Sequence, residues 1–274
     1  MLSNESLSSE ILGHGAYVCV RRGEGAAAPP ATAPLRSLTE RLGLRNEFEP
    51  DHPPGRESFA LLGRHGATPA DIADEGILGA DWIIHVASSR GEVVDELCES
   101  VTKLLAPVAR ARVLRGVVRP KNYTGAAMNN WAYGHAVVQQ PGTVMPNAFL
   151  CPMSKTAEWW RKDWMERHTY FLPRYDEQGR MVSEGHALAT AAGIPCLLRR
   201  TYKSLTEPAV EGDYDFVSYF ECTDESIPTF QQVCAALRDV TRNPEWRFVR
   251  EGPTWQGRRV ASWEELFTRS QKTA

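Results

Sequence analysis

The stretch Asp81–Arg119 decides the fold, because its sequence, DWIIHVASSRGEVVDELCESVTKLLAPVARARVLRGVVR, reads as strand, helix and strand in succession. Residues 81–87 are rich in β-branched and aromatic side chains and predict a strand. Across residues 92–105, apolar side chains recur every three or four positions, which predicts an amphipathic helix that Pro107 ends. Residues 112–119 predict the second strand. The stretch is therefore a β-α-β unit.

The same layout returns about 135 residues further along the chain. Residues 215–221 (DFVSYFE) predict a strand, a helix is expected to begin near Ser226 and Pro228, and residues 246–250 (WRFVR) predict the closing strand. One face of that helix is apolar and consists of Phe230, Val233, Cys234, Leu237 and Val240. Two such units indicate a duplicated ferredoxin-like half, so the predicted fold class is α+β with two ferredoxin-like repeats. Two open sheets of this kind can close into a barrel, which removes their exposed edges.

Three parts of the chain are predicted. Residues 1–57 are an N-terminal extension that is partly flexible, residues 58–150 are the N-terminal ferredoxin-like repeat, and residues 151–274 are the C-terminal repeat. The extension is predicted from a Pro/Ala/Gly tract at residues 23–34 (GEGAAAPPATAP) and a second cluster of turn-forming residues at 51–55 (DHPPG). Within it, the sequence AYVCV at residues 16–20 can still form one strand.

Composition excludes several classes of protein. The 274 residues are 42% hydrophobic and 24% charged, which is typical of a folded globular chain and not of a disordered one. The formal net charge of −3 provides no field that would attract nucleic acid, and no apolar run approaches the roughly 20 residues of a membrane span. We therefore expect no nucleic-acid partner, no membrane segment and a cytoplasmic location. The six cysteines form no CxxC pair and are expected to be reduced and mostly buried.

A tryptophan-rich helix is predicted at residues 154–170 (SKTAEWWRKDWMERHTY). Adjacent helical residues point about 100° apart, so Trp159 and Trp160 cannot both face one narrow core. Lys155 lies four residues before Trp159, on the same face of such a helix. Two interpretations stay open: the indoles form the wall of a flat apolar ligand whose carboxylate pairs with Lys155, or they are a core pair beside a lysine that reaches to solvent.

Two further residues stand out by their spacing. His186 follows Gly185 at the start of a small-residue apolar helix, and Arg199 comes thirteen residues later at the head of a predicted strand. One neutral imidazole suffices to hold haem iron, and an arginine on the opposite side can hold an anionic ligand. The alternative is a buried histidine with ordinary hydrogen bonds. Arg200 would point to the other face of the strand, so only one of the two arginines can enter such a site.

The order and spacing of these segments resemble the chlorite dismutase family between residues 80 and 270. The segments are Arg119–Tyr123 (RPKNY), Ser154–Lys155 with Glu158–Trp160, Gly185–His186, Arg199 with Tyr202, residues 216–221, Phe230 with Leu237–Arg238, Gly252–Pro253 with Gly257, and residues 262–267 (SWEELF). The resemblance implies a dimeric α+β barrel with haem b in the C-terminal repeat, His186 as the axial ligand to the iron, and Arg199 as the distal catalytic arginine. It also implies that Lys155 and Tyr123 contact the haem propionates and that Trp159 and Trp160 wall the haem.

The implied activity is that of a haem b oxidoreductase that converts chlorite to chloride and O2, by oxygen transfer to ferric haem and recombination. Its relatives that decarboxylate coproporphyrin lack the distal arginine, so Arg199 argues against that version of the reaction. The expected partners are a small anionic or peroxide-type substrate and further copies of the chain, with a pentamer among the possible rings. Two alternatives stay open: a haem enzyme of the same fold acting on a peroxide or an organic N–O substrate in secondary metabolism, or a haem-free α+β barrel that binds a small molecule.

The sequence departs from the family at two places beside the expected haem. The family places a glutamate where it hydrogen-bonds the proximal histidine, and counting from Phe230 and Leu237 puts Arg242 at that position. A cation cannot accept the imidazole N–H, so either Glu245 or Asp239 takes the place after a local shift, or the iron chemistry is altered. The stretch at residues 205–213 is also about four residues longer than the usual turn of the family.

Overall fold

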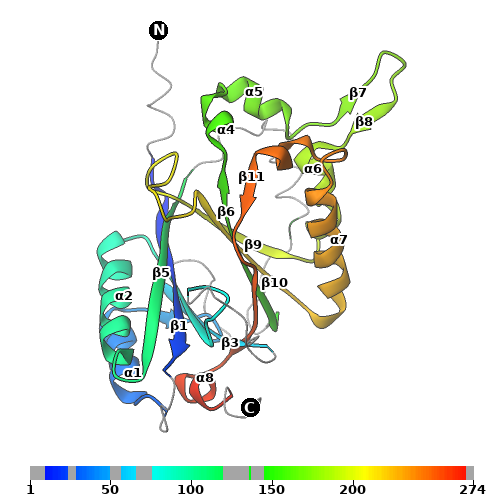
Figure 1. Ribbon diagram of the computed structural model, residues 1–274. Coiled ribbons are helices and arrows are strands. Elements are labelled where there is room, and N and C mark those ends of the chain that lie inside the picture. The colour runs from blue at the N-terminus through cyan, green and yellow to red at the C-terminus, as the bar shows by residue number, and fades with distance from the viewer. Residues whose placement is uncertain are drawn as a thin grey trace.

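The computed structural model describes residues 10–23, 29–49, 57–65, 76–119, 136 and 145–269. In this part of the chain, eight strands close into a barrel, four from each of two repeats (Figure 1). Their order around the ring is β10-β9-β5-β1-β4-β3-β12-β6, and β6 pairs with β10 again to complete it. Neighbouring strands around the ring are antiparallel. The fold class is α+β with two ferredoxin-like repeats, as predicted, and closure of the ring pairs the edges of both sheets.

The N-terminal repeat follows the ferredoxin-like order of strand, helix, two strands, helix and strand. Its elements are β1 (Gly13–Arg22), α1 (Ala33–Arg41), the short β2 (Arg45–Asn46), β3 (Ser58–Arg64), β4 (Trp82–Ser88), α2 (Gly91–Leu105) and β5 (Ala109–Val118).

The C-terminal repeat has the same order, except that short helices and a hairpin stand where its first helix belongs. Its elements are β6 (Asn147–Lys155), α4 (Ala157–Arg161), α5 (Trp164–Thr169), β7 (Arg174–Tyr175), β8 (Met181–Ser183), α6 (Gly185–Thr190), β9 (Leu198–Lys203), β10 (Phe216–Cys222), α7 (Ile227–Arg238), β11 (Val249–Glu251), β12 (Trp255–Val260) and α8 (Trp263–Arg269). Among the described residues, no helix is both long and apolar enough to cross a membrane.

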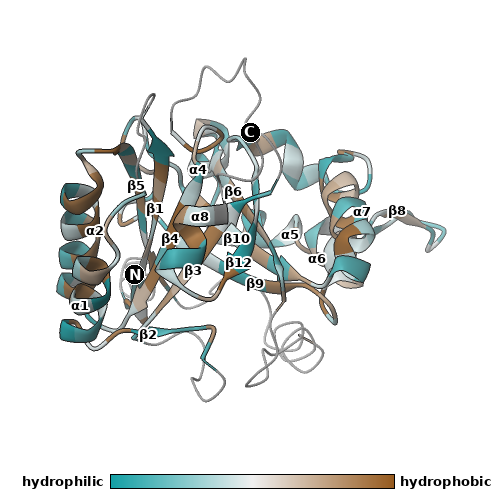
Figure 2. Ribbon diagram, turned by 90° about the horizontal axis from the view of Figure 1, so that it is seen from below, coloured by the Kyte–Doolittle hydropathy of each residue, from teal (hydrophilic) through white to brown (hydrophobic). Residues whose placement is uncertain are grey.

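Each barrel strand alternates between an inner and an outer face. The interior is packed with large side chains, among them Tyr17, Ile83, Leu150, Tyr219 and Trp255. Two helical layers cover the outer face on opposite sides of the barrel, α1 and α2 on one side and α6 and α7 on the other (Figures 1 and 2). Apolar residues of the helices and of the strands pack against each other in both layers. The second layer packs against the outer face of β9, β10 and β6; α6 carries His186, and β9 carries Arg199.

The N-terminal extension predicted for residues 1–57 is wrong for residues 13–22, which form β1, and for residues 33–46, which form α1 and β2. The predicted strand at residues 16–20 exists, but as part of β1, which pairs with both β4 and β5 and belongs to the barrel itself. The Pro/Ala/Gly tract misled the prediction because Pro34 lies in the first turn of α1, where a proline has no hydrogen bond to lose. The first repeat therefore begins near residue 13 rather than at residue 58.

Two element predictions in the C-terminal repeat also need correction. Of the closing strand predicted at residues 246–250, only Val249 and Arg250 are strand, as part of β11; residues 244–248 form a 3₁₀ helix, and β12 closes the repeat. The single helix predicted at residues 154–170 is the end of β6 followed by two short helices. The break between the two helices has a local cause, because the Asp163 side chain accepts a hydrogen bond from the Glu166 N–H at 2.8 Å and caps the start of α5.

A buried polar network joins the two repeats inside the barrel. The Glu47 carboxylate, which follows β2, accepts two hydrogen bonds from the Arg200 guanidinium of β9 at 2.6 and 2.8 Å, and a third from Ser58 at 2.7 Å. The side chain of Glu47 is fully buried. Burial alone would raise the pKa of Glu47, but the charges of Arg200 and other neighbours hold that pKa well below its usual range. Glu47 therefore stays ionised and binds the strand that carries Arg199.

His85 of β4 occupies the same interior and meets both repeats. Its Nε2 lies 2.8 Å from the Tyr202 hydroxyl, and its ring stacks on Tyr17 at 4.8 Å. Burial lowers the pKa of His85 to about 3, and the charge of Glu47 only partly opposes this shift, so the imidazole is neutral at physiological pH. The histidine is thus a packed and hydrogen-bonded member of the core.

We predict that Glu47→Gln destabilises the fold strongly, because it leaves the Arg200 cation buried without its counter-charge. The free energy of unfolding should fall by about 3 to 5 kcal/mol, measured by urea unfolding at neutral pH. Glu49→Gln is the matched control, since Glu49 also pairs with an arginine, Arg45, but is about half exposed. Glu49→Gln should lower the free energy of unfolding by less than about 1 kcal/mol. An equal decrease in the two variants would contradict the account.

Candidate functional site

His186 lies at the start of α6, and the local backbone explains its placement. Gly185 has φ +66°, and a Cβ at this position would collide with the backbone of Leu172, so only glycine fits. The carbonyl oxygen of Arg242 accepts hydrogen bonds from the N–H groups of Glu184 and Gly185 at 2.9 and 3.0 Å, and the His186 N–H donates to Tyr170 at 3.1 Å. These hydrogen bonds fix the backbone on both sides of the turn that carries His186.

Glu245 fixes the orientation of the His186 ring. Its Oε2 lies 2.7 Å from His186 Nδ1, and its Oε1 pairs with the ammonium of Lys155. The side chains of Glu245 and Lys155 are only 5% and 6% exposed. Burial would raise the pKa of Glu245, but the charges and hydrogen bonds of His186 and Lys155 lower it to about 2. Burial lowers the pKa of Lys155, and Glu245 opposes that shift.

The ionised carboxylate determines where the imidazole proton lies. An ionised carboxylate can only accept hydrogen bonds, so Nδ1 is protonated and donates to Glu245, and Nε2 points away from that carboxylate. Nε2 makes no hydrogen bond to any residue that the structure describes. An imidazole whose Nδ1 donates to a buried carboxylate and whose Nε2 is available is the arrangement that proteins use for metal-ligating histidines.

The position counted from the sequence for this glutamate falls on Arg242, and the structure gives that residue another role. The Arg242 guanidinium binds Glu184 at the surface through two contacts of 2.9 Å. Of the two carboxylates named as replacements, Glu245 binds the imidazole, whereas Asp239 accepts hydrogen bonds from Thr241 and from the backbone of Arg242. The 3₁₀ helix that begins at Pro244 brings Glu245 inward and leaves Arg242 outside.

Arg199 and Arg200 lie on opposite faces of β9, as predicted. Arg200 enters the barrel and binds Glu47, so Arg199 lies on the outer face, together with Thr201. The register places Phe220 of β10 directly opposite Arg199, and the guanidinium lies 6.0 Å from the centroid of that ring. The Nε of Arg199 donates to the Thr201 hydroxyl at 3.1 Å. Arg199 thus places an exposed cation on the outer face of the sheet.

The two tryptophans have separate packing partners. Trp159 is buried in a cluster with Phe171 and Phe248, and the Lys155 ammonium lies 4.3 Å from its ring centroid. Trp160 stacks on Phe216, with ring centroids 6.3 Å apart, and donates to Asp215 at 3.2 Å. Phe171 also contacts the His186 ring at 5.2 Å between centroids, so the Trp159 cluster supports the imidazole.

Lys155 and Tyr123 are the two residues that the resemblance places at the haem propionates. The resemblance implies that Lys155 contacts a propionate, but the structure commits its ammonium to Glu245, because a buried ammonium and a buried carboxylate stabilise each other. Lys155 therefore acts on the imidazole through Glu245. Tyr123 lies outside the described residues.

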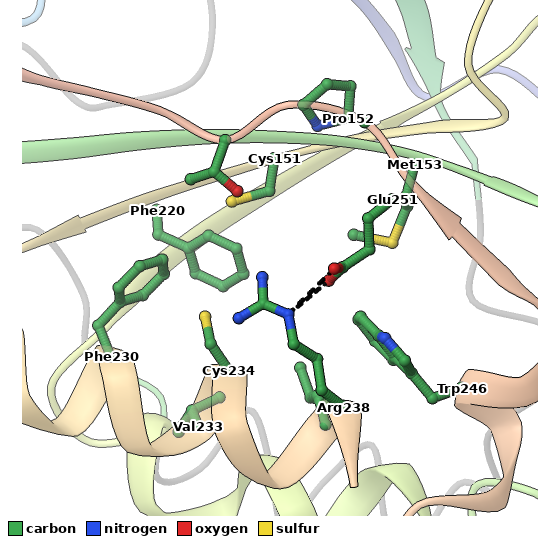
Figure 3. Close-up of a pocket in the computed structure, with 13 residues that line it drawn as sticks. Cys151, Pro152, Met153, Phe220, Phe230, Val233, Cys234, Arg238, Trp246 and Glu251 are labelled. Carbon is green, nitrogen blue, oxygen red and sulfur yellow. Dashed lines mark hydrogen bonds and ion pairs between the residues drawn. The ribbon is translucent and has the colours of Figure 1, made fainter. Parts of the chain in front are cut away.

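An apolar pocket borders the site on the other side of Phe220 (Figure 3). It lies between α7 and the outer face of the sheet and has a volume of about 470 Å³, its open mouth included. Cys151 and Cys234 point into it from β6 and α7, and burial raises the pKa of the Cys151 thiol to about 12. Its charged lining residues, Arg238 and Glu251, pair with each other at 2.9 Å. Because its thiols are protonated and its two charged residues pair with each other, this pocket is an apolar surface beside the site.

We predict that Glu245→Gln destabilises the protein at neutral pH by roughly 3 kcal/mol, because Lys155 loses its buried counter-charge. The folded pKa of Glu245, about 2, lies below the ordinary value of 4.5, so its stabilising contribution is present above pH 4.5 and is lost as the pH falls toward 2. Urea unfolding at pH 7, 5, 4 and 3 should therefore show the gap between parent and variant shrinking with acid. Glu251→Gln, which removes one partner of the half-exposed Arg238 pair, is the control with a small effect at each pH. A gap that does not change with pH would contradict the assigned charge state.

The sequence alone matches no protein-family model and no curated protein. Solved structures match over nearly the whole chain. A doubly substituted chlorite dismutase from Candidatus Nitrospira defluvii gives a TM-score of 0.69 at 17% identity, with 98% of this chain and 99% of that chain covered. Chlorite dismutase from the same organism in complex with imidazole gives 0.69 at 18% identity, with 95% and 96% covered. A singly substituted variant in complex with cyanide gives 0.67 at 19% identity, with 99% and 100% covered. The resemblance seen in the sequence is confirmed at the level of structure, and this chain has the fold of the chlorite dismutases.

Proposed function

We propose that this protein is a haem b oxidoreductase of the chlorite dismutase type, with His186 as the axial ligand of the iron and Arg199 as the group that holds the anionic substrate. The single observation that carries the proposal is the His186 imidazole, whose Nδ1 proton is bound by the ionised Glu245 and whose Nε2 is available. The likeness to solved chlorite dismutases supports the same reaction class.

The residues fit a haem on chemical grounds. A haem iron needs only one protein nitrogen, which His186 supplies, and leaves the opposite side for a substrate. The outer sheet face offers an arginine for an anion and the Phe220 ring for an apolar wall. Bound haem would supply the redox-active iron that the conversion of chlorite to chloride and O2 requires.

Each side chain has a defined part in this proposal. Glu245 accepts a hydrogen bond from the Nδ1–H of His186 and makes the imidazole a stronger electron donor. Lys155 compensates the buried charge of Glu245 and so keeps it ionised. Arg199 binds the anion and retains the anionic product fragment by charge-assisted hydrogen bonds. Arg200 has no part in the chemistry, because it is committed to Glu47 in the barrel interior.

The carboxylate at Glu245 also bears on the alternative substrates. A peroxide or an organic N–O substrate would fit both an arginine at the position of the proximal glutamate and the longer stretch at residues 205–213. Glu245 supplies the carboxylate, which removes the first of these two arguments, and chlorite is the substrate we propose.

We further propose that the protein forms a homo-oligomer and acts in the cytoplasm. Large apolar side chains are exposed on α5 and on the β7–β8 hairpin, where a second copy could cover them. They are Trp164, Met165, Tyr175, Met181 and Val182.

We predict a Soret band when the protein is expressed with supplementary haem, because His186 binds the iron. His186→Ala should lose this band, whereas His168→Ala, which removes a histidine of α5, should keep it. Absorption spectra of the purified proteins make the test. An oxygen electrode then measures O2 released from chlorite, and the parent should exceed an equal concentration of free haem.

The outcomes separate the alternatives. A parent protein without a Soret band would favour a haem-free barrel and contradict the proposal. A Soret band that depends on His186, without O2 release above free haem, would keep the haem and reject chlorite as the substrate.

A further inference from the structure

Arg199 does not stand alone on the outer face of the sheet. The register of β9 and β10 places Thr201 opposite Ser218, and Arg199 opposite Phe220. Thr201 Oγ1 accepts from Arg199 Nε at 3.1 Å and lies 3.3 Å from Ser218 Oγ. Thr201, Ser218 and Phe220 therefore form one connected group that supports the Arg199 side chain.

The Thr201 and Ser218 hydroxyls have enough donors and acceptors to form both of these hydrogen bonds. A threonine hydroxyl has one proton and two lone pairs, so Thr201 can accept from Arg199 and still share a hydrogen with Ser218. Ser218 is 2% exposed, which leaves its hydroxyl little access to competing water. The hydrogen bond from the guanidinium is charge-assisted and is stronger than one between neutral groups.

The choice of donor atom has a geometric consequence. Arginine is a long side chain whose planar guanidinium takes many orientations when unsupported. Holding Nε fixes the plane of the group, and the Phe220 ring beneath it limits tilting. The two terminal nitrogens, which form the fork that binds anions, then have a defined direction.

We propose that Thr201, backed by Ser218, is the positioning residue that aims the Arg199 fork and so sets how tightly the site holds a small anion. This inference rests on the proposed function. Nothing in the resemblance of the sequence assigns a role to either hydroxyl.

The test uses the haem-loaded ferric protein and fluoride, a small anion whose binding to ferric haem shifts the absorption spectrum. Thr201→Val keeps the shape of the side chain but removes the acceptor, and it should raise the fluoride Kd about 5-fold to 10-fold. Thr201→Ser retains the hydroxyl and should stay within about twofold of the parent. Thr206→Val, in the exposed loop after β9, is the matched control and should leave the Kd unchanged.

A double-mutant cycle shows whether Thr201 acts through the arginine. In an Arg199→Gln background, Thr201→Val should have no further effect on the fluoride Kd, because the group that it positions is gone. An effect that persists in that background, or a Kd within twofold of the parent in Thr201→Val alone, would overturn the inference. With chlorite, Thr201→Val should raise KM more than it lowers kcat.

Two safeguards keep the result interpretable. If Thr201→Val does not fold, judged by circular dichroism, Ser218→Ala takes its place and should raise the Kd about 2-fold to 4-fold, and no change would overturn the inference. A parent without a Soret band would reject the proposed function and this inference with it, whereas normal haem binding with an unaltered fluoride Kd rejects the inference alone.

Discussion

The buried ion pair between Glu47 and Arg200 fixes the face of β9 on which each arginine lies. Glu47 comes from the N-terminal repeat and Arg200 from the C-terminal repeat, 153 residues apart in sequence. A shift of β9 by one residue would turn Arg200 away from Glu47 and would also turn Tyr202 outward, which would break its buried hydrogen bond with His85. The same pair that joins the repeats therefore commits Arg199 to the outer face. The geometry of the candidate site follows from a contact inside the barrel.

The second constraint is the balance of charge behind His186. Lys155, Glu245 and the imidazole lie in a row in which each group determines the state of the next. A buried ammonium keeps the carboxylate ionised, and the ionised carboxylate keeps the proton on Nδ1. These residues come from β6, from the 3₁₀ helix after α7 and from α6. The second repeat thus builds its site from three segments that only the closed fold brings together.

Much of the fold could be predicted from local patterns, because strands and amphipathic helices have periodic sequences. The β-α-β unit at residues 81–119 and the strand at residues 16–20 were predicted correctly for this reason. The roles of residues 13–22 and 33–46 were missed because a Pro/Ala/Gly tract looks the same in a flexible segment and in a loop that begins a helix. Arg199 and Arg200 were assigned to opposite faces correctly, since the alternation of a strand needs no tertiary information.

The parts of the site that depend on distant partners could not be predicted in the same way. Glu47 and Glu49 are alike in sequence, but only Glu47 meets distant partners, among them Arg200 and Ser58, in the barrel interior. The count from α7 gave Arg242 for the carboxylate behind His186, because residues 239–243 separate the end of α7 from the 3₁₀ helix that carries Glu245. Glu245 lies 59 residues from His186, so no local pattern links them.

The central claim is that His186, held by Glu245, donates to a haem iron. The most direct measurement is the resonance Raman spectrum of the reduced, haem-loaded protein, compared between the parent and Glu245→Gln. The account predicts an iron–imidazole stretching band in the parent and its shift to lower frequency in the variant, because the imidazole loses the carboxylate that strengthens its donation. A parent spectrum without an iron–imidazole band, or a band that Glu245→Gln leaves unmoved, would contradict it.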